Sequence, residues 1–196
     1  MEALNDFLVG SASGFDTHPH EEIEIISYCV DGELSHRDSL GNAETLRRGD
    51  VGYQCAGSGL VHAELNSSPD EKLRFVQVLI LPNTPGLTPG YAYRRFAPRD
   101  RRNKWLNVAS GRPKEGIVQI RQDADVFVSE VDGGRRLYFA VARGRQAYLV
   151  CLEGSVAISG LELGQGSSAK AVGDIELSID AQVNAHLLLV EMAESA

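Results

Sequence analysis

Two short segments hold the side chains best suited to bind a metal ion. His18 and His20 lie in the segment T-H-P-H, and His62 and Glu64 lie in the segment H-A-E. Residues i and i+2 of a β-strand project from the same face, so each segment would present its two side chains together. Three imidazoles and one carboxylate suit Fe(II), Mn, Co, Ni, Cu or Zn, and they disfavour Ca and Mg, which prefer oxygen ligands throughout.

The two segments together argue for a metal site more strongly than either does alone. An H-x-H pair by itself often marks an exposed turn, and His62 by itself would be an ordinary polar residue. Three of the five histidines nevertheless fall in these segments, about forty residues apart. We therefore predict one divalent ion on these four ligands, with open positions for water, O2 or a substrate oxygen, which favours Fe(II).

Three other residues serve as contrast cases. Glu24 has the same i, i+2 parity as His20, so it could be a fifth ligand, a partner that orients a histidine, or a member of an ordinary ion pair. His36 lies in a polar strand between turns, and His186 has no histidine or carboxylate two residues away. We interpret His36 and His186 as structural or surface residues.

Short β-rich runs separated by turn residues would have to position these side chains. They recur at regular spacing, which is typical of a sandwich or barrel, and no segment combines a helical period with caps. Between residues 82 and 103, four prolines and two glycines break the pattern, and we interpret this stretch as a surface linker. The predicted strands are residues 23–30, 33–39, 43–48, 51–56, 73–82, 104–110, 116–122, 125–131, 136–142, 147–154, 155–160, 174–180 and 186–192.

The two halves of the chain repeat one order of elements. In each half an apolar strand is followed by an acidic-Gly turn, a strand, a Gly turn, a strand, a Gly-Asp turn and another strand. This repetition predicts a tandem duplication of one β-fold. We expect a metal-binding domain over residues 1–100 and a similar domain without metal over residues 101–196, because the second half has no H-x-H pair.

Composition limits the classes of function. Of the 196 residues 43% are apolar and the formal net charge is −8, so a folded core is expected and direct binding of nucleic acid is not. Cys29, Cys55 and Cys151 form no C-x-x-C pair or disulfide framework, which favours the reducing cytoplasm. We expect no signal peptide and no membrane span, and the motifs of serine hydrolases and phosphate-binding loops are absent.

Two longer stretches resemble known motifs. Residues 14–32 resemble the first cupin motif and residues 49–66 the second, and the closest likeness is to the pirin family, through H-P-H-x-x-x-E-I-I-S-Y, D-S-L-G-N, A-G-S-G-x-x-H-x-E-x-N and F-V-Q-V-L-I-L-P. The resemblance implies an all-β bicupin, two cupin-type β-barrels in tandem, with metal only in the first. It implies His18, His20, His62 and Glu64 as the ligands, and it excludes Glu24. Family members usually carry a longer segment before the first motif, so we expect a truncated N-terminal barrel.

The same resemblance implies two kinds of function. Pirin-like proteins include bacterial enzymes similar to quercetin 2,3-dioxygenases, which implies an oxidoreductase that opens a flavonol, or a similar enol-bearing aromatic, with O2. Glu64 would then also be the base that takes the flavonol proton. Nuclear members that act as iron-dependent transcription co-regulators imply the alternative, a non-catalytic metal-binding protein with a protein partner.

Overall fold

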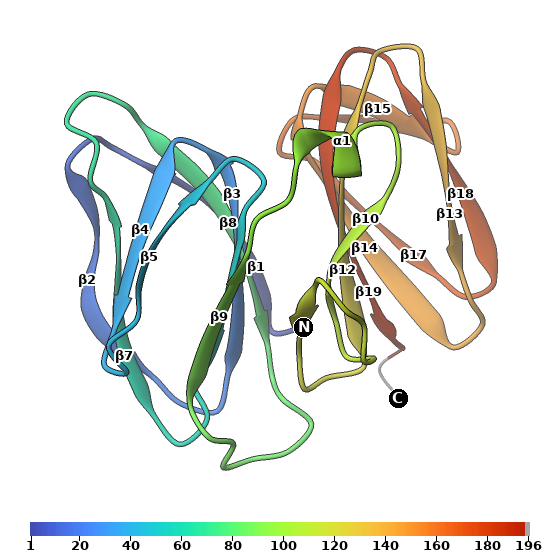
Figure 1. Cartoon of the computed structure of the whole chain (residues 1–196). Helices are drawn as coiled ribbons and strands as arrows, with labels where there is room; N and C mark the ends of the chain where they lie inside the picture. The colour runs from blue at the N-terminus through green and yellow to red at the C-terminus, as the bar shows by residue number, and fades with distance from the viewer. Residues whose placement is uncertain (195–196) are drawn as a thin grey trace. The chain divides into compact units, whose positions relative to one another are not determined.

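The apolar runs of the sequence form two separate sets of β-sheets in the computed structural model, which describes residues 1–194 (Figure 1). The first unit comprises Met1–Phe96 with the short segment Ile120–Gln122. The second comprises Ala97–Gln119 and the chain from Asp123 onward. None of the helices in the described residues has the length and apolar character needed to cross a membrane.

Nine strands build the first unit as two antiparallel sheets. One sheet has the order β1-β8-β3-β6-β9 and the other the order β2-β7-β4-β5. Their inward side chains face one another, as expected when strands alternate between core and solvent. The strands are β1 (Ala3–Val9), β2 (Ser13–His20), β3 (Glu24–Asp31), β4 (Glu33–Asp38), β5 (Ala43–Arg47), β6 (Val51–Cys55), β7 (Leu60–Asn66), β8 (Leu73–Ile80) and β9 (Gly90–Arg94).

The stretch interpreted as a surface linker, residues 82–103, is only partly irregular. It contains β9, which pairs with β6 at the edge of the five-stranded sheet, and the short helix α1 (Pro98–Arg101). Pro89 precedes β9 and Pro98 follows it, so no proline removes a backbone N–H from the β6–β9 pairing. The strand can therefore form between the two prolines. The linker interpretation was therefore wrong for β9.

The second unit has a similar construction. One sheet has the order β11-β10-β12-β19-β14-β17 and the other the order β13-β18-β15-β16. The strand predicted over 116–122 shortens to β11, because the chain then leaves for the first unit. The strands are β10 (Leu106–Ser110), β11 (Val118–Gln119), β12 (Ala124–Val131), β13 (Arg136–Val141), β14 (Arg145–Glu153), β15 (Ser155–Ile158), β16 (Leu161–Gly164), β17 (Ser168–Val172), β18 (Ile175–Ala181) and β19 (Ala185–Ala193).

The predicted duplication is confirmed by topology. The neighbours β8-β3-β6 recur as β19-β14-β17, and β7-β4-β5 recurs as β18-β15-β16. The turns that follow β3 and β14 are built alike. Gly32 and Gly154 have φ of 78° and 77°, and an added Cβ would meet a backbone carbonyl oxygen in both turns. Only glycine fits such a position without strain.

The interiors of the two units differ in polarity. The second unit is filled by one large apolar cluster that draws on both of its sheets. In the first unit the corresponding cluster is smaller, with Val9, Cys29, Leu34, Leu46, Leu73 and Phe75 as its buried members. The same interior also holds several buried polar side chains, including His36, Gln54, His62, Glu64 and Gln77. Because buried polar groups cost free energy unless they are paired, this polar half of the first unit is the place to look for function.

Candidate metal centre

Three imidazoles converge where β2 pairs with β7. His18 lies opposite His62 in this antiparallel ladder, and His20 lies two residues further along β2. The ring centroids are 4.4 Å apart for His18 and His62, 5.0 Å for His20 and His62, and 4.9 Å for His18 and His20. One ring nitrogen from each histidine lies within 4.8 Å of the others, so the geometry suits a single ion.

A bulge in β2 sets the direction of this pair of histidines. Phe15 of β2 lies opposite Glu64 of β7, and His18 lies opposite His62. Two residues therefore lie between these positions in β2, whereas only one lies between their partners in β7. The extra residue shifts the alternation between inward and outward side chains by one position. The odd-numbered Phe15 and the even-numbered His18 therefore both face the interior of the unit. Strand parity within T-H-P-H predicts that His18 and His20 point together, but it does not reveal this bulge.

The ring nitrogens leave room for an ion. His18 Nδ1 lies 2.7 Å from the carbonyl oxygen of Asp16, which can only accept, so in a neutral ring Nδ1 carries the hydrogen and Nε2 is bare. His62 Nε2 is buried and has no hydrogen-bond partner among the described residues. Burial lowers the pKa of His62 to about 3, an effect increased by its neighbours His18 and His20, so the ring is neutral. A buried, unpaired nitrogen facing two other imidazoles fits a transition-metal ligand.

Glu64 lies one inward position further along β7, deeper in the unit. Its Oε1 accepts a hydrogen bond from Ser27 Oγ at 3.0 Å, and its Oε2 accepts one from Gln77 Nε2 at 2.6 Å. Burial raises the pKa of Glu64 to about 7, although both hydrogen bonds oppose the shift. The structure groups Glu64 with His62 and His36, not with His18 and His20, so of the four predicted ligands the three histidines converge most closely.

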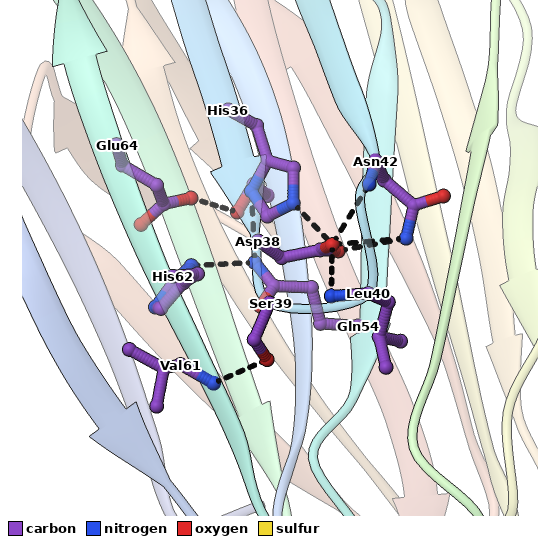
Figure 2. Close-up of polar contacts among 10 residues, drawn as sticks. His36, Asp38, Ser39, Leu40, Asn42, Gln54, Val61, His62 and Glu64 are labelled. Atoms are coloured by element: carbon purple, nitrogen blue, oxygen red, sulfur yellow. Dashed lines mark hydrogen bonds and ion pairs between the residues drawn. The ribbon is translucent and has the colours of Figure 1, made fainter.

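His36 was interpreted as a structural or surface residue, and the structure excludes the surface alternative. It is buried in β4, lies opposite Glu64, and stacks on Tyr91 with ring centroids 4.3 Å apart. Its Nε2 lies 3.2 Å from Asp38 Oδ2, and Asp38 is held in turn by Asn42 and the backbone of Leu40 (Figure 2). The alternation H-R-D, which puts His36 and Asp38 on one face, was the available signal. His186 is also buried, and it pairs with Glu153 at 3.1 Å in the second unit.

Glu24 does not share a face with His18 and His20 as its sequence parity suggested. β2 ends at His20 and Glu22 adopts φ of 51°, so Glu24 begins a new strand with its own phase. Its carboxylate accepts a hydrogen bond from the Tyr53 hydroxyl at 2.5 Å and from the Arg121 backbone N–H at 2.8 Å. These contacts account for its burial without a metal ion.

Three buried polar residues of the five-stranded sheet support the centre and were not predicted. Gln77 and Ser27 hold Glu64. Gln54 Nε2 lies 2.8 Å from His62 Nδ1 (Figure 2). Each stands in a run of otherwise apolar strand residues. A polar residue at a position that should be buried was the signal that could have found them.

The second unit has the same fold, so its residues can be compared with those of the candidate centre position by position. When the turns at Gly32 and Gly154 are superposed, His36 corresponds to Ile158. The partner of His36 across the ladder, Glu64, then corresponds to Ile179, the partner of Ile158. The same registers place apolar residues where the three converging histidines stand: Phe139 for His18, Val141 for His20 and Leu177 for His62. These residues belong to the apolar cluster of the second unit or pack against it. The duplicated barrel is thus stabilised by apolar contacts where the first unit offers nitrogen and oxygen.

Comparisons with known proteins agree with this description. The family model described as Pirin matches residues 2–80, and the model described as Quercetinase C-terminal cupin domain matches residues 106–192. A protein of Caulobacter vibrioides named Pirin-like protein is 35% identical over 194 residues, which are 98% of this chain and 83% of the relative. A protein of Escherichia coli (strain K12) named Quercetin 2,3-dioxygenase is 29% identical over 192 residues, covering 98% of this chain and 82% of the relative.

A solved structure extends the likeness to three dimensions. The bacterial pirin YhhW from Escherichia coli, crystallised in complex with nickel(II), superposes with a TM-score of 0.88 at 30% sequence identity. The superposition covers 98% of this chain and 82% of that one.

Proposed function

The chain belongs to the pirin family of tandem cupins, and from this premise we propose that it is a metal-dependent dioxygenase which opens a flavonol, or a similar enol-bearing aromatic compound, with O2. The observation that carries the proposal is the buried, unpaired Nε2 of His62, which faces two further imidazoles. Relatives named quercetin 2,3-dioxygenase support the reaction class.

The proposed ligands are His18, His20, His62 and Glu64, with one divalent transition metal per chain. Fe(II) is the favoured ion, and Mn, Co, Ni, Cu or Zn fit the same donors. The nickel(II) complex of YhhW supports a divalent ion in this family. When bound, the ion would supply Lewis acidity and open coordination positions for a substrate oxygen and O2.

Glu64 is the proposed base. Burial raises the pKa of its carboxyl group to about 7 in the metal-free protein, and a value near neutral pH suits a group that takes the proton of an enolic hydroxyl group and later returns it. Ser27 and Gln77 donate one hydrogen bond to each carboxylate oxygen, which fixes the orientation of the group while it does so.

Turnover after anaerobic reconstitution tests the proposal. Metal-free protein is loaded in turn with Fe(II), Mn(II), Co(II), Ni(II) and Cu(II), and quercetin and O2 are added. We expect O2 consumption and a ring-opened product, detected by mass spectrometry, with at least one ion. The variant Glu64→Gln should bind the ion more weakly and show no turnover even at ion concentrations that fill its site, and His186→Gln should retain both binding and turnover. Stoichiometric metal binding without turnover for any ion would instead favour the alternative, a non-catalytic regulatory protein.

We also propose a cytoplasmic location. Cys29, Cys55 and Cys151 are buried and unbonded to one another, as expected for a chain that works in a reducing compartment.

A further inference from the structure

Gln54 links two histidines inside the first unit. It is only 2% exposed, it lies in β6, and its Nε2 is 2.8 Å from His62 Nδ1 and 3.3 Å from His36 Nδ1 (Figure 2). The strand registers align Gln54 with Ala171 of the second unit, where apolar residues replace both histidines. The link therefore occurs only in the barrel that holds the candidate centre.

The amide orientation decides where His62 carries its hydrogen. An amide NH₂ group only donates, so a neutral His62 that faces it accepts at Nδ1 and carries its hydrogen on Nε2. A histidine that binds a metal through Nε2 needs the opposite arrangement. Nε2 must be bare, Nδ1 must carry the hydrogen, and an acceptor must face Nδ1.

Two buried atoms without partners point to the same rearrangement. Gln54 Oε1 and His62 Nε2 are both buried and both lack a hydrogen-bond partner in the described part of the chain. A half-turn of the amide about its last side-chain bond would bring Oε1 to the place of Nε2 without moving the backbone, because the two atoms are nearly equal in size. The Nδ1–H of His62 would then donate to Oε1, and Nε2 would be free to bind an ion. The turn would give Oε1 a donor and leave His62 Nε2 free for an ion, and it would end the contact between the amide N–H and His36 Nδ1.

We propose that Gln54 is a positioning residue whose amide turns when the centre takes up an ion, so that its oxygen holds His62 in the metal-binding tautomer. The inference rests on the proposed metal site and not on dioxygenase turnover. The turn also removes the N–H that reaches His36, so His36 should sense occupation of the centre although it holds no ion in this arrangement.

Two substitutions separate this role from simple packing. Gln54→Leu keeps most of the volume but offers His62 no acceptor, and loss of such a partner costs about 10–100-fold in metal affinity. Gln54→Glu offers only acceptors at neutral pH, so it should retain affinity within about threefold if the oxygen is what matters. Gln146→Leu is the matched control, because Gln146 is a buried glutamine of the second unit that donates to the carbonyl oxygen of Ala193.

The readouts are zinc affinity and the histidine tautomer, neither of which requires turnover. Zn(II) affinity is measured by competition with a chelating dye, and the tautomers of His62 and His36 are measured by long-range ¹H–¹⁵N NMR in metal-free and zinc-loaded protein. We expect His62 to change from Nε2–H to Nδ1–H on loading, the His36 ring signals to shift, and only Gln54→Leu to lose affinity. If Gln54→Leu folds and binds zinc as tightly as the parent, or if His62 is already Nδ1–H without metal, the proposal is overturned. Normal zinc binding and tautomer exchange with no turnover would overturn the dioxygenase proposal alone.

Discussion

His18 lies directly opposite His62 in the β2–β7 ladder, with their ring centroids 4.4 Å apart. Both side chains come from strands, and the bulge that aims them lies within the same pairing. The separation of the three imidazoles is therefore set by how closely the backbones of β2 and β7 approach. Sites built on paired strands in this way are more rigid than sites built on loops.

Gly14 controls this approach. A Cβ added there would lie 2.4 Å from the carbonyl oxygen of Glu64 and 2.7 Å from the Cα of Leu65, so Gly14→Ala must push the two strands apart. We expect the free energy of unfolding to fall by about 2 kcal/mol or more and the affinity for metal to fall with it. Urea denaturation and a metal titration measure the two effects.

The control for Gly14 is Gly164→Ala. Gly164 ends the edge strand β16, and an added Cβ meets no atom within 4 Å. Stability and metal affinity should both stay close to those of the parent. Equal behaviour of the two alanine variants would contradict the argument that backbone approach at Gly14 shapes the centre.

Direct removal of a ligand should have a larger effect. His18→Ala, His20→Ala and His62→Ala should each weaken metal binding by about 100-fold or more, since losing a ligand should cost more than losing a partner of a ligand. His186→Gln, which removes a buried histidine from the second unit, should still bind one ion per chain. Metal analysis of dialysed protein checks these expectations, and equal loss in all four variants would mean that the effect is one of folding.

Strand alternation predicted much of this centre from sequence, because an i, i+2 pair within one strand needs no knowledge of its neighbours. His18 with His20 and His62 with Glu64 are such pairs. The same rule misled at Glu24, where the left-handed conformation of Glu22 ends one strand and restarts the alternation. Local parity is thus informative only as long as the strand continues.

The other members of the centre depend on pairing between strands, which the sequence does not state. His36 meets Glu64 because β4 pairs with β7 in one particular register. Gln54 and Gln77 reach the histidines and Glu64 from the opposite sheet. A buried polar residue in an apolar strand marks such a position, but its partner becomes known only with the fold.

The pH dependence of stability should reveal the buried carboxyl group. Burial raises the pKa of Glu64 from 4.5 to about 7, so the folded state keeps this proton over a range in which the unfolded state has lost it. The stabilisation is fully present below pH 4.5 and is lost as the pH rises to about 7. A shift of this size corresponds to about 3 kcal/mol.

Comparison with Glu64→Gln isolates this contribution. The amide does not titrate, so the difference in the free energy of unfolding between metal-free parent and variant should change by about 3 kcal/mol between pH 4.5 and 7.5. The nearby histidines also titrate in this range, but they occur in both proteins and their contributions largely cancel. A difference that does not vary with pH would contradict a raised pKa at Glu64.

Gln77 should tune the same carboxyl group. Its 2.6 Å hydrogen bond to Oε2 stabilises the charged form of Glu64 and thereby opposes the rise in pKa caused by burial. Gln77→Leu should therefore raise the pKa of Glu64 by about one further unit, since a hydrogen bond to a charged group contributes about 1.5–3 kcal/mol. A ¹³C NMR titration of the glutamate carboxyl groups in metal-free protein follows this directly. Ser27→Ala should shift the pKa in the same direction, and Gln146→Leu, far along the chain in the second unit, should leave it unchanged. A lower pKa in Gln77→Leu would mean that this amide does not stabilise the carboxylate, and the orientation assigned to the proposed base would have to be abandoned.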